Sequence, residues 1–201
     1  MIWCRFDDAG RPRYGLVSGD AVTPVAGDPF TGHEPRPAER RPVADVRLLP
    51  PVVPGTFFCA GLNYAGHAGR AAAGGLAAAV PTRPEIGYRA NSALIGPGEP
   101  IVRPAGYDEP LVAEGELVAV IGATVRHAAP AEARQAVLGW TIGNDVSARA
   151  WQRTDRTLWR AKNSDTFKPM GPYLVTGADP LAATTTVRVD GAVAEIGRAH
   201  V

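Results

Sequence analysis

The stretch VAEGELVAVIG, residues 112–122, is apolar enough to predict a strand packed on a core, yet it carries two carboxylates. Glu114 and Glu116 are two residues apart, so in a strand their side chains share one face with Val118 and Val120. Neighbouring carboxylates repel each other, and burial raises the cost, so both stay ionised only if positive charge lies between them. A divalent cation would supply it; the alternative is an edge strand with both glutamates in solvent.

The bulk composition is typical of a soluble globular chain. Of its 201 residues, 45% are hydrophobic and 20% are charged. The formal net charge of +1 gives no electrostatic case for nucleic acid or an anionic membrane as a partner. The N-terminus lacks the apolar core of a signal peptide, and the small-residue run 71–80 is too short to cross a bilayer. We therefore expect a cytoplasmic protein.

The use of lysine points to one segment. Of 21 basic residues only two are lysines, Lys162 and Lys168, and both lie in RAKNSDTFKPMGP, residues 160–172. In a chain that otherwise uses arginine, a lysine indicates a site that needs a compact charge or an amine with a shifted pKa. The alternative is chance in an arginine-rich sequence.

The pattern along the chain predicts an α+β fold in which β structure predominates. Residues 1–45 predict a small N-terminal β module followed by a linker rich in proline and charge, and residues 46–194 predict the main domain. After a strand at 56–60, an alanine- and glycine-rich segment suits a lid. A helix is predicted from Pro130 through PAEARQAVLGWTI, and Asp190-Gly191 predicts a hairpin turn. No alternating βαβ rhythm is found.

A third carboxylate, Asp145, follows a predicted strand in TIGNDVSAR. With Glu114 and Glu116 it forms an all-oxygen set, which favours Mg²⁺ or Mn²⁺, with Ca²⁺ as a further option, over a zinc-type site. Cys4 and Cys59 fit no metal or redox spacing and are expected in strands as small buried hydrophobes. Asp145 could equally be the N-cap of a helix that begins in VSARAWQ.

An ordered set of motifs resembles the fumarylacetoacetate hydrolase family. The motifs are GLNYAGHA (61–68), GYRANSALIGPGEPIV (87–102), EGELVAVIG (114–122), GWTIGNDVSARAWQ (139–152) and RAKNSDTFKPMGPYLVT (160–176). The resemblance implies the family's mixed β roll, a homodimer, and a small N-terminal β module of the kind that precedes many bacterial members. It also implies that Glu114, Glu116 and Asp145 bind Mg²⁺ or Mn²⁺.

The resemblance also implies a chemistry. Members act on small 2-oxo or 1,3-dicarbonyl acids by C–C hydrolysis, decarboxylation or enol isomerisation, with a metal that stabilises the enolate. Lys162 matches the active-site lysine, and Arg149 and Gln152 match positions that line the substrate pocket. His67 matches the lid histidine that activates water in hydrolytic members. Without the family, Arg149, Gln152 and His67 would be interpreted as ordinary surface residues.

Three sites in or beside these motifs depart from the family pattern. Arg70 stands where many members have a glutamate that orients the lid histidine, which favours isomerase or decarboxylase over hydrolase. Ala113 replaces an aromatic residue, and Arg89-Ala90 replaces Lys-Pro, which keeps a cation. The alternative to an enzyme is a non-catalytic metal-binding paralogue or an inactive truncated fragment.

The C-terminal end departs from the family as well. Family domains continue past VRVDG through a helix, closing strands and a Thr-Gly-Thr-Pro loop. The final residues IGRAHV match the translation of a common sequencing adapter. We interpret residues 195–201 as an adapter artefact and expect an incomplete β roll that exposes a sheet edge.

Overall fold

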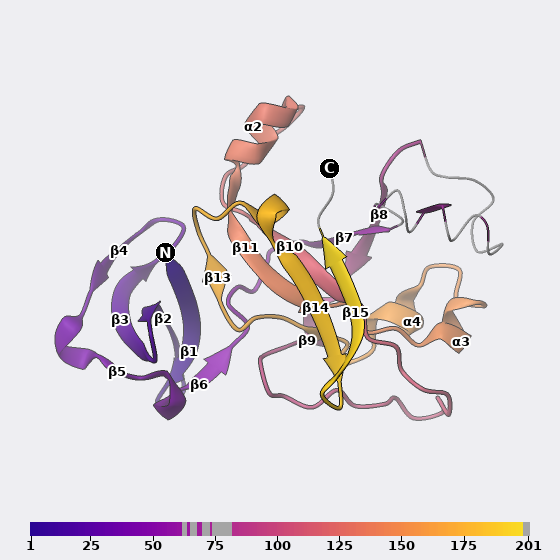
Figure 1. Ribbon diagram of the computed structural model, residues 1–201, viewed down its shortest axis with the longest axis horizontal. Helices are drawn as coiled ribbons and strands as arrows, with labels where there is room; N and C mark the ends of the chain where they lie inside the picture. The colour runs from indigo at the N-terminus through magenta and orange to yellow at the C-terminus, as the bar shows by residue number, and fades with distance from the viewer. Residues whose placement is uncertain (62–63, 65–67, 70–72, 74–81, 199–201) are drawn as a thin grey trace.

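A computed structural model describes residues 1–198, apart from residues 62–63, 65–67, 70–72 and 74–81. Strands predominate in this part of the chain, and its α-helices have four to six residues, which confirms the predicted α+β class. Figure 1 shows the N-terminal strands at one end of the molecule and helices α3 and α4 at the other. No helix among the described residues is long and apolar enough to cross a membrane.

The largest sheet in the described part of the chain has nine strands, paired antiparallel. Seven follow the order β10-β11-β13-β1-β2-β3-β4, while β5 pairs with β3 and β6 with β1. Strand β1 therefore joins the N-terminal strands to the sheet that carries β10. The bounds are β1 Ile2–Asp8, β2 Arg11–Ser18, β3 Ala21–Asp28, β4 Gly32–Pro35, β5 Arg41–Pro42, β6 Arg47–Leu49, β10 Gly115–Ile121, β11 Val137–Asn144 and β13 Leu174–Val175.

Three smaller strand pairs and short helices complete the described structure. Strands β7 and β8 form an antiparallel pair, β9 and β12 a parallel pair, and β14 and β15 a hairpin. Their bounds are β7 Phe57–Gly61, β8 Glu85–Arg89, β9 Leu94–Ile95, β12 Lys168–Pro169, β14 Thr184–Val189 and β15 Ala192–Arg198. The helices are α2 Pro130–Gln135, α3 Arg149–Gln152 and α4 Trp159–Asn163, with 3₁₀ turns at Pro37–Glu39, Val43–Asp45, Asn91–Ala93 and Pro180–Ala182.

The N-terminal strands have a core of their own. Cys4, Phe6 and Val22 are fully buried, as predicted for a cysteine that acts as a small hydrophobe. The proline-rich segment after them is more regular than the predicted linker, because it contains β4, β5, β6 and two 3₁₀ turns. Strands β5 and β6 gain the backbone hydrogen bonds that β3 and β1 offer, and these outweigh the weak strand preference of the sequence.

The predicted helix from Pro130 is shorter than expected. Helix α2 ends at Gln135, and Val137 begins β11, which pairs with β10 on one side and β13 on the other. Valine, tryptophan, threonine and isoleucine in this stretch favour a pleated strand with two partners over a helix. The correction matters because β11 leads directly to Asp145.

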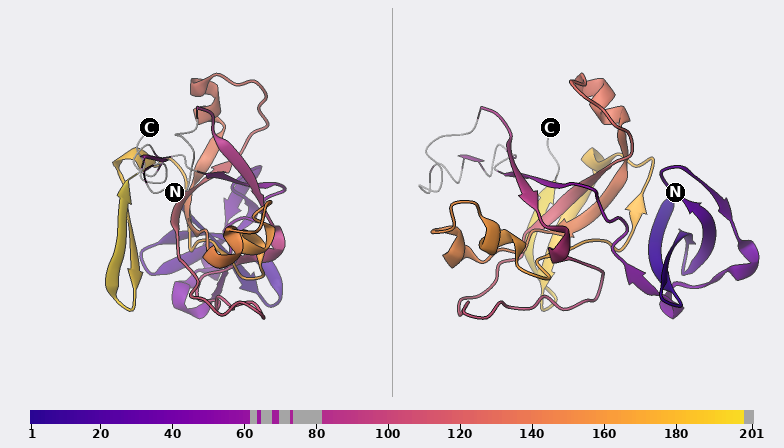
Figure 2. Two further views of the ribbon diagram at one scale, coloured as in Figure 1. Left: turned by 90° about the vertical axis from the view of Figure 1, so that its right-hand side faces the viewer. Right: turned by 180° about the vertical axis from the view of Figure 1, so that it is seen from behind.

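Strand β10 lies between β11 and the hairpin of β14 and β15, which stands along one side of the molecule in the left view of Figure 2. A Cβ atom at Gly115 would lie 2.4 Å from Cγ2 of Val187, so the close approach of this hairpin requires glycine there. The hairpin turns at Asp190 and Gly191 with φ of 50° and 79°, as the Asp-Gly pair predicts.

Candidate metal centre

Two neighbouring strand ends carry the three predicted carboxylates. In the register of β10 and β11, Gly115 pairs with Asn144, so Glu114 lies just before one strand and Asp145 just after the other. The backbone N–H of Asp145 donates to the carbonyl oxygen of Glu114 at 2.9 Å. The backbone N–H of Glu114 donates to the Asn144 side-chain oxygen at 3.0 Å. These two hydrogen bonds hold the backbone at Glu114 against the backbone at Asn144 and Asp145.

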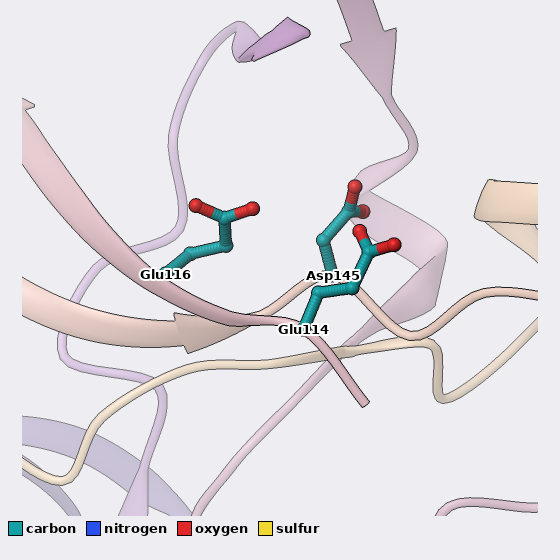
Figure 3. Close-up of side chains that lie close together, drawn as sticks. All are labelled: Glu114, Glu116 and Asp145. Atoms are coloured by element: carbon teal, nitrogen blue, oxygen red, sulfur yellow. The ribbon is translucent and has the colours of Figure 1, made fainter. Parts of the chain in front are cut away.

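The carboxylates of Glu114, Glu116 and Asp145 converge, as Figure 3 shows. One oxygen of each lies within 4.8 Å of the others, with Asp145 buried and the two glutamates half-buried. Three hard oxygen donors at this spacing fit Mg²⁺, Mn²⁺ or Ca²⁺ and leave positions for further ligands. Asp145 is not a helix N-cap, because α3 begins at Arg149 with Ala148 at the cap position.

Lys162 lies between two of these carboxylates. Its Nζ is 2.6 Å from Oε2 of Glu114 and 2.9 Å from Oδ2 of Asp145. The lysine side chain is only 6% exposed, so these contacts are made largely out of solvent. Oε2 of Glu114 and Oδ2 of Asp145 therefore both point toward the ammonium group of Lys162.

Arg149 and Gln152, the predicted pocket residues, lie on α3 beside the same cluster. Arg149 donates from Nη2 to Oε1 of Glu114 and from Nη1 to Oε1 of Gln152, the latter at 2.7 Å. The side chain of Arg149 is 41% exposed, so this contact is nearer solvent than those of Lys162. The structure thus brings together six of the seven side chains predicted for the site.

The seventh, His67, lies outside the described residues, and so does Arg70. The expected lid falls largely on the same segment. The role of His67 therefore stays a prediction.

The structure adds two cations to the predicted set, Arg89 and Lys168. Arg89 donates from Nε to Oδ1 and from Nη2 to Oδ2 of Asp145, both at 2.9 Å. Nζ of Lys168 is 2.7 Å from Oδ1 of Asp145. In the sequence, the rarity of lysine drew attention to Lys168, and the replacement of a family lysine by another cation drew attention to Arg89. Neither signal identified Asp145 as their shared partner.

These neighbours set the ionisation of Asp145. Burial alone would raise the pKa of its carboxyl, but hydrogen bonds from Arg89 and the charges of Lys168 and Lys162 outweigh burial and hold the pKa well below its usual range. Burial lowers the pKa of Lys168 to about 8, although Asp145 partly offsets that effect. Asp145 is thus an ionised ligand candidate in a buried position.

Cys59 lies nearer the site than its sequence suggested. It is in β7 as expected, but it is only half-buried, and its Sγ is 3.8 Å from Oδ2 of Asp145. Burial, with the charge of Asp145 as a second cause, raises the pKa of this thiol to about 11. At neutral pH Cys59 is therefore a neutral neighbour of the carboxylate cluster rather than a thiolate.

A cleft of about 1080 Å³ opens beside the cluster. Glu116, Asp145 and Lys168 line its polar part, and its apolar wall includes Phe57, Val118 and other side chains of β7 and β10. A cleft that joins a few charged groups to an apolar wall suits a small organic acid.

Known proteins match this chain along nearly its whole length. Residues 56–200 match the family described as Fumarylacetoacetate (FAA) hydrolase C-terminal, and residues 1–51 match Rv2993c-like, N-terminal. Protein Rv2993c of Mycobacterium tuberculosis is 46% identical over 173 residues, which cover 86% of this chain and 61% of that protein. The human mitochondrial oxaloacetate tautomerase FAHD2A is 35% identical over 165 residues, covering 79% and 51%. The chain spans about half to three-fifths of the length of these curated relatives.

Solved structures agree with these matches. The 5-carboxymethyl-2-hydroxymuconate delta-isomerase from Mycobacterium smegmatis has a TM-score of 0.82 and 36% identity, covering 98% of this chain and 76% of that one. The 2-hydroxyhepta-2,4-diene-1,7-dioate isomerase from Mycobacterium marinum has a TM-score of 0.82 and 34% identity, covering 98% and 75%. These likenesses confirm the predicted mixed β roll.

Proposed function

The chain belongs to the fumarylacetoacetate hydrolase family, and we propose that it is a divalent-metal-dependent enzyme that acts on a 2-oxo or enol (di)carboxylate. The observation that carries this proposal is the convergence of Glu114, Glu116 and Asp145 within 4.8 Å, beside a cleft, with Lys162 and Arg149 on the same carboxylates. Anionic ligands for a cation and cationic ligands for an acid thus share one small site.

The metal in this proposal is Mg²⁺ or Mn²⁺, with Ca²⁺ as a further option, and Glu114, Glu116 and Asp145 hold it. The donor set supports the assignment, because carboxylate oxygens are the ligands that hard divalent cations prefer. When bound, such an ion polarises a carbonyl and stabilises negative charge that develops on its oxygen.

In this proposal, Lys162 binds the carboxylate or oxo oxygen of the substrate. An ammonium has three N–H donors, and the described partners of Lys162 use two of them, on Glu114 and Asp145. The remaining donor supports a role in substrate binding. Arg149, oriented by its hydrogen bond to Gln152, supplies the planar donor pair that suits a second carboxylate.

Among C–C hydrolysis, decarboxylation and isomerisation, we favour isomerisation of an enol or keto acid. Relatives that are 34–36% identical carry the names isomerase and oxaloacetate tautomerase. The loss of a glutamate at position 70 agrees with this choice, since arginine cannot accept a hydrogen bond from the histidine that would activate water. His67 and Lys162 remain the proposed catalytic side chains.

We also propose that the protein works as a homodimer in the cytoplasm, with a small oxo acid as its partner and no nucleic acid or membrane. The family resemblance supports the dimer, and the net charge of +1 supports the absence of polyanionic partners. Size-exclusion chromatography with light scattering tests the oligomeric state.

The enzymatic activity is tested on a panel of 2-oxo dicarboxylic acids in the presence of Mg²⁺ or Mn²⁺. The loss of enol absorbance measures the rate. We expect metal-dependent turnover that chelation abolishes and that the Glu116→Gln variant loses. Metal-dependent stabilisation without turnover on any acid of the panel would instead identify a non-catalytic metal-binding paralogue. An acylpyruvate cleaved at a rate that falls steeply in His67→Ala would overturn the preference for isomerisation.

A further inference from the structure

The carboxylate of Asp145 is more heavily contacted than ligation of a metal requires. In the described part of the chain, four nitrogen contacts reach it, two from Arg89 and one each from Lys162 and Lys168. A carboxylate offers about four lone-pair sites, so these nitrogens match its capacity. Oδ1 is held by Arg89 and Lys168, while Oδ2 also faces Lys162, the residue that reaches Glu114.

Lys168 is fixed where Lys162 is not. Besides its contact with Asp145, its Nζ donates to the carbonyl oxygens of Val146 at 3.2 Å and Phe167 at 2.9 Å. All three ammonium donors are therefore used, and the side chain is only 3% exposed. These three contacts hold the charge of Lys168 beside Asp145.

The side chains around the cluster carry more positive than negative charge, which does not favour binding of a cation alone. The cluster has three carboxylates, and two of them, Glu114 and Asp145, pair with four cationic side chains among the described residues, namely Arg89, Arg149, Lys162 and Lys168. Arg89 and Lys168 are 9% and 3% exposed, so solvent screens their charges little. A divalent ion that joins this set raises the positive excess, whereas a bound dianion lowers it.

We propose that Lys168, together with Arg89, is a positioning residue of the metal centre whose buried charge makes affinity for the divalent ion depend on a bound dianion. The inference rests on the metal centre of the proposed function. Lys168 fixes Oδ1 of Asp145 and leaves Oδ2 toward Glu114. Its charge weakens binding of the metal alone and strengthens binding of the metal with an anionic acid. Because coupling is reciprocal, the acid also binds more tightly with the metal.

Isothermal titration of the full chain with Mn²⁺, with and without saturating oxalate, tests this dependence. Oxalate is a stable chelating dianion, and a blank titration corrects for its own complex with Mn²⁺. We expect oxalate to raise the Mn²⁺ affinity of the wild type by roughly tenfold or more, within the usual range of coupling between sites. In Lys168→Met, we expect tighter binding of Mn²⁺ alone and a smaller gain from oxalate. Lys168→Arg keeps the charge and should keep the coupling.

The possible outcomes separate this inference from the proposed function. If the wild type binds Mn²⁺ but oxalate leaves its affinity unchanged, the coupling is wrong and the metal centre stands. If Lys168→Met, shown by thermal melting to be folded, keeps the full gain from oxalate, Lys168 is not its source. If the wild type binds no Mn²⁺ under either condition, both proposals fail.

Discussion

Asp8 and Asp145 have the same chemistry in two different surroundings. Asp8, in the N-terminal strands, pairs with Arg13 at 2.7 Å and Arg41 at 3.2 Å, but its side chain is 25% exposed. Asp145 pairs with arginine and lysine at similar distances and is 7% exposed. Exposed pairs contribute little to stability, whereas a buried charge that loses its partners is costly. Burial therefore distinguishes the two clusters. A charged cluster that is costly to bury, like the one around Asp145, indicates a functional site more strongly than an exposed ion pair does.

The largest difference between the two aspartates should appear when each is neutralised. Asp145→Asn leaves buried cations without their counter-charge, and we expect it to lower the free energy of unfolding by about 3–5 kcal/mol and to abolish Mn²⁺ binding. Asp8→Asn should leave metal binding intact and change stability only slightly. Denaturant unfolding of the two variants checks this. Equal losses of stability would show that burial does not separate the two clusters.

Turnover should distinguish the cations at Asp145 from those at Asp8. Lys162→Met removes a donor from the proposed substrate position, so we expect kcat/KM to fall by roughly 100-fold, the usual cost of a lost charge-stabilising donor. Arg41→Met, beside Asp8, is the matched control and should leave kcat/KM unchanged. Steady-state kinetics on the acid that the panel identifies measures both. A similar kcat/KM in the two variants would remove Lys162 from the site.

The dependence of stability on acid pH should also distinguish Asp145 from Asp8. Hydrogen bonds and charge from Arg13 and Arg41 hold the pKa of Asp8 below its usual range, despite some desolvation, and the neighbours of Asp145 do the same more strongly. The pKa of an aspartate in the unfolded chain is about 3.9, so unfolding takes up protons as the pH approaches and falls below that value. The stability that either carboxylate contributes is thus present above about pH 4 and is lost as pH falls through the folded pKa.

We therefore expect the free energy of unfolding to fall below pH 4 in the wild type and to fall least in Asp145→Asn, with Asp8→Asn close to the wild type. Melting temperatures between pH 6 and pH 2 measure these slopes. A wild-type slope in Asp145→Asn would mean that the buried carboxylate is not held ionised.

The smallest effect should come from an ion pair whose cation is largely exposed to solvent. Arg47 contacts Asp7 at 3.2 Å and Glu99 at 3.4 Å, with its own side chain 63% exposed. Arg47→Ala should change the free energy of unfolding by less than about 0.5 kcal/mol, because solvent and salt screen such pairs. Chemical denaturation at low and high salt checks this value. A loss above about 2 kcal/mol would show that surface pairs matter to this fold.

Local pattern predicted much of the site. The spacing of Glu114 and Glu116, and a strand that leads to Asp145, depend on short-range periodicity, and the structure brings these carboxylates together. The Asp-Gly turn before β15 is likewise a local preference, and it is confirmed. The domain boundaries at 45 and 194 and the assignment of residues 195–201 stay predictions.

Contacts between distant segments could not be predicted in the same way. Arg89 reaches Asp145 across 56 residues, and no periodicity records that pairing. The segment after Gln135 was predicted as helix because its apolar spacing suits one, but neighbours on both sides make it strand β11. The proline-rich segment that follows the N-terminal strands was predicted as a linker, yet β4, β5 and β6 along it pair with β3 and β1.

The central claim is that Glu114, Glu116 and Asp145 form a divalent-metal site, and Mn²⁺ titration followed by electron paramagnetic resonance tests it most directly. Free and bound Mn²⁺ differ in signal, so both the number of sites and the affinity are measured without any substrate. The predicted result is one ion per chain in the wild type and an affinity lowered by more than about 100-fold in Glu116→Gln. An affinity in Glu116→Gln equal to that of the wild type would contradict the claim.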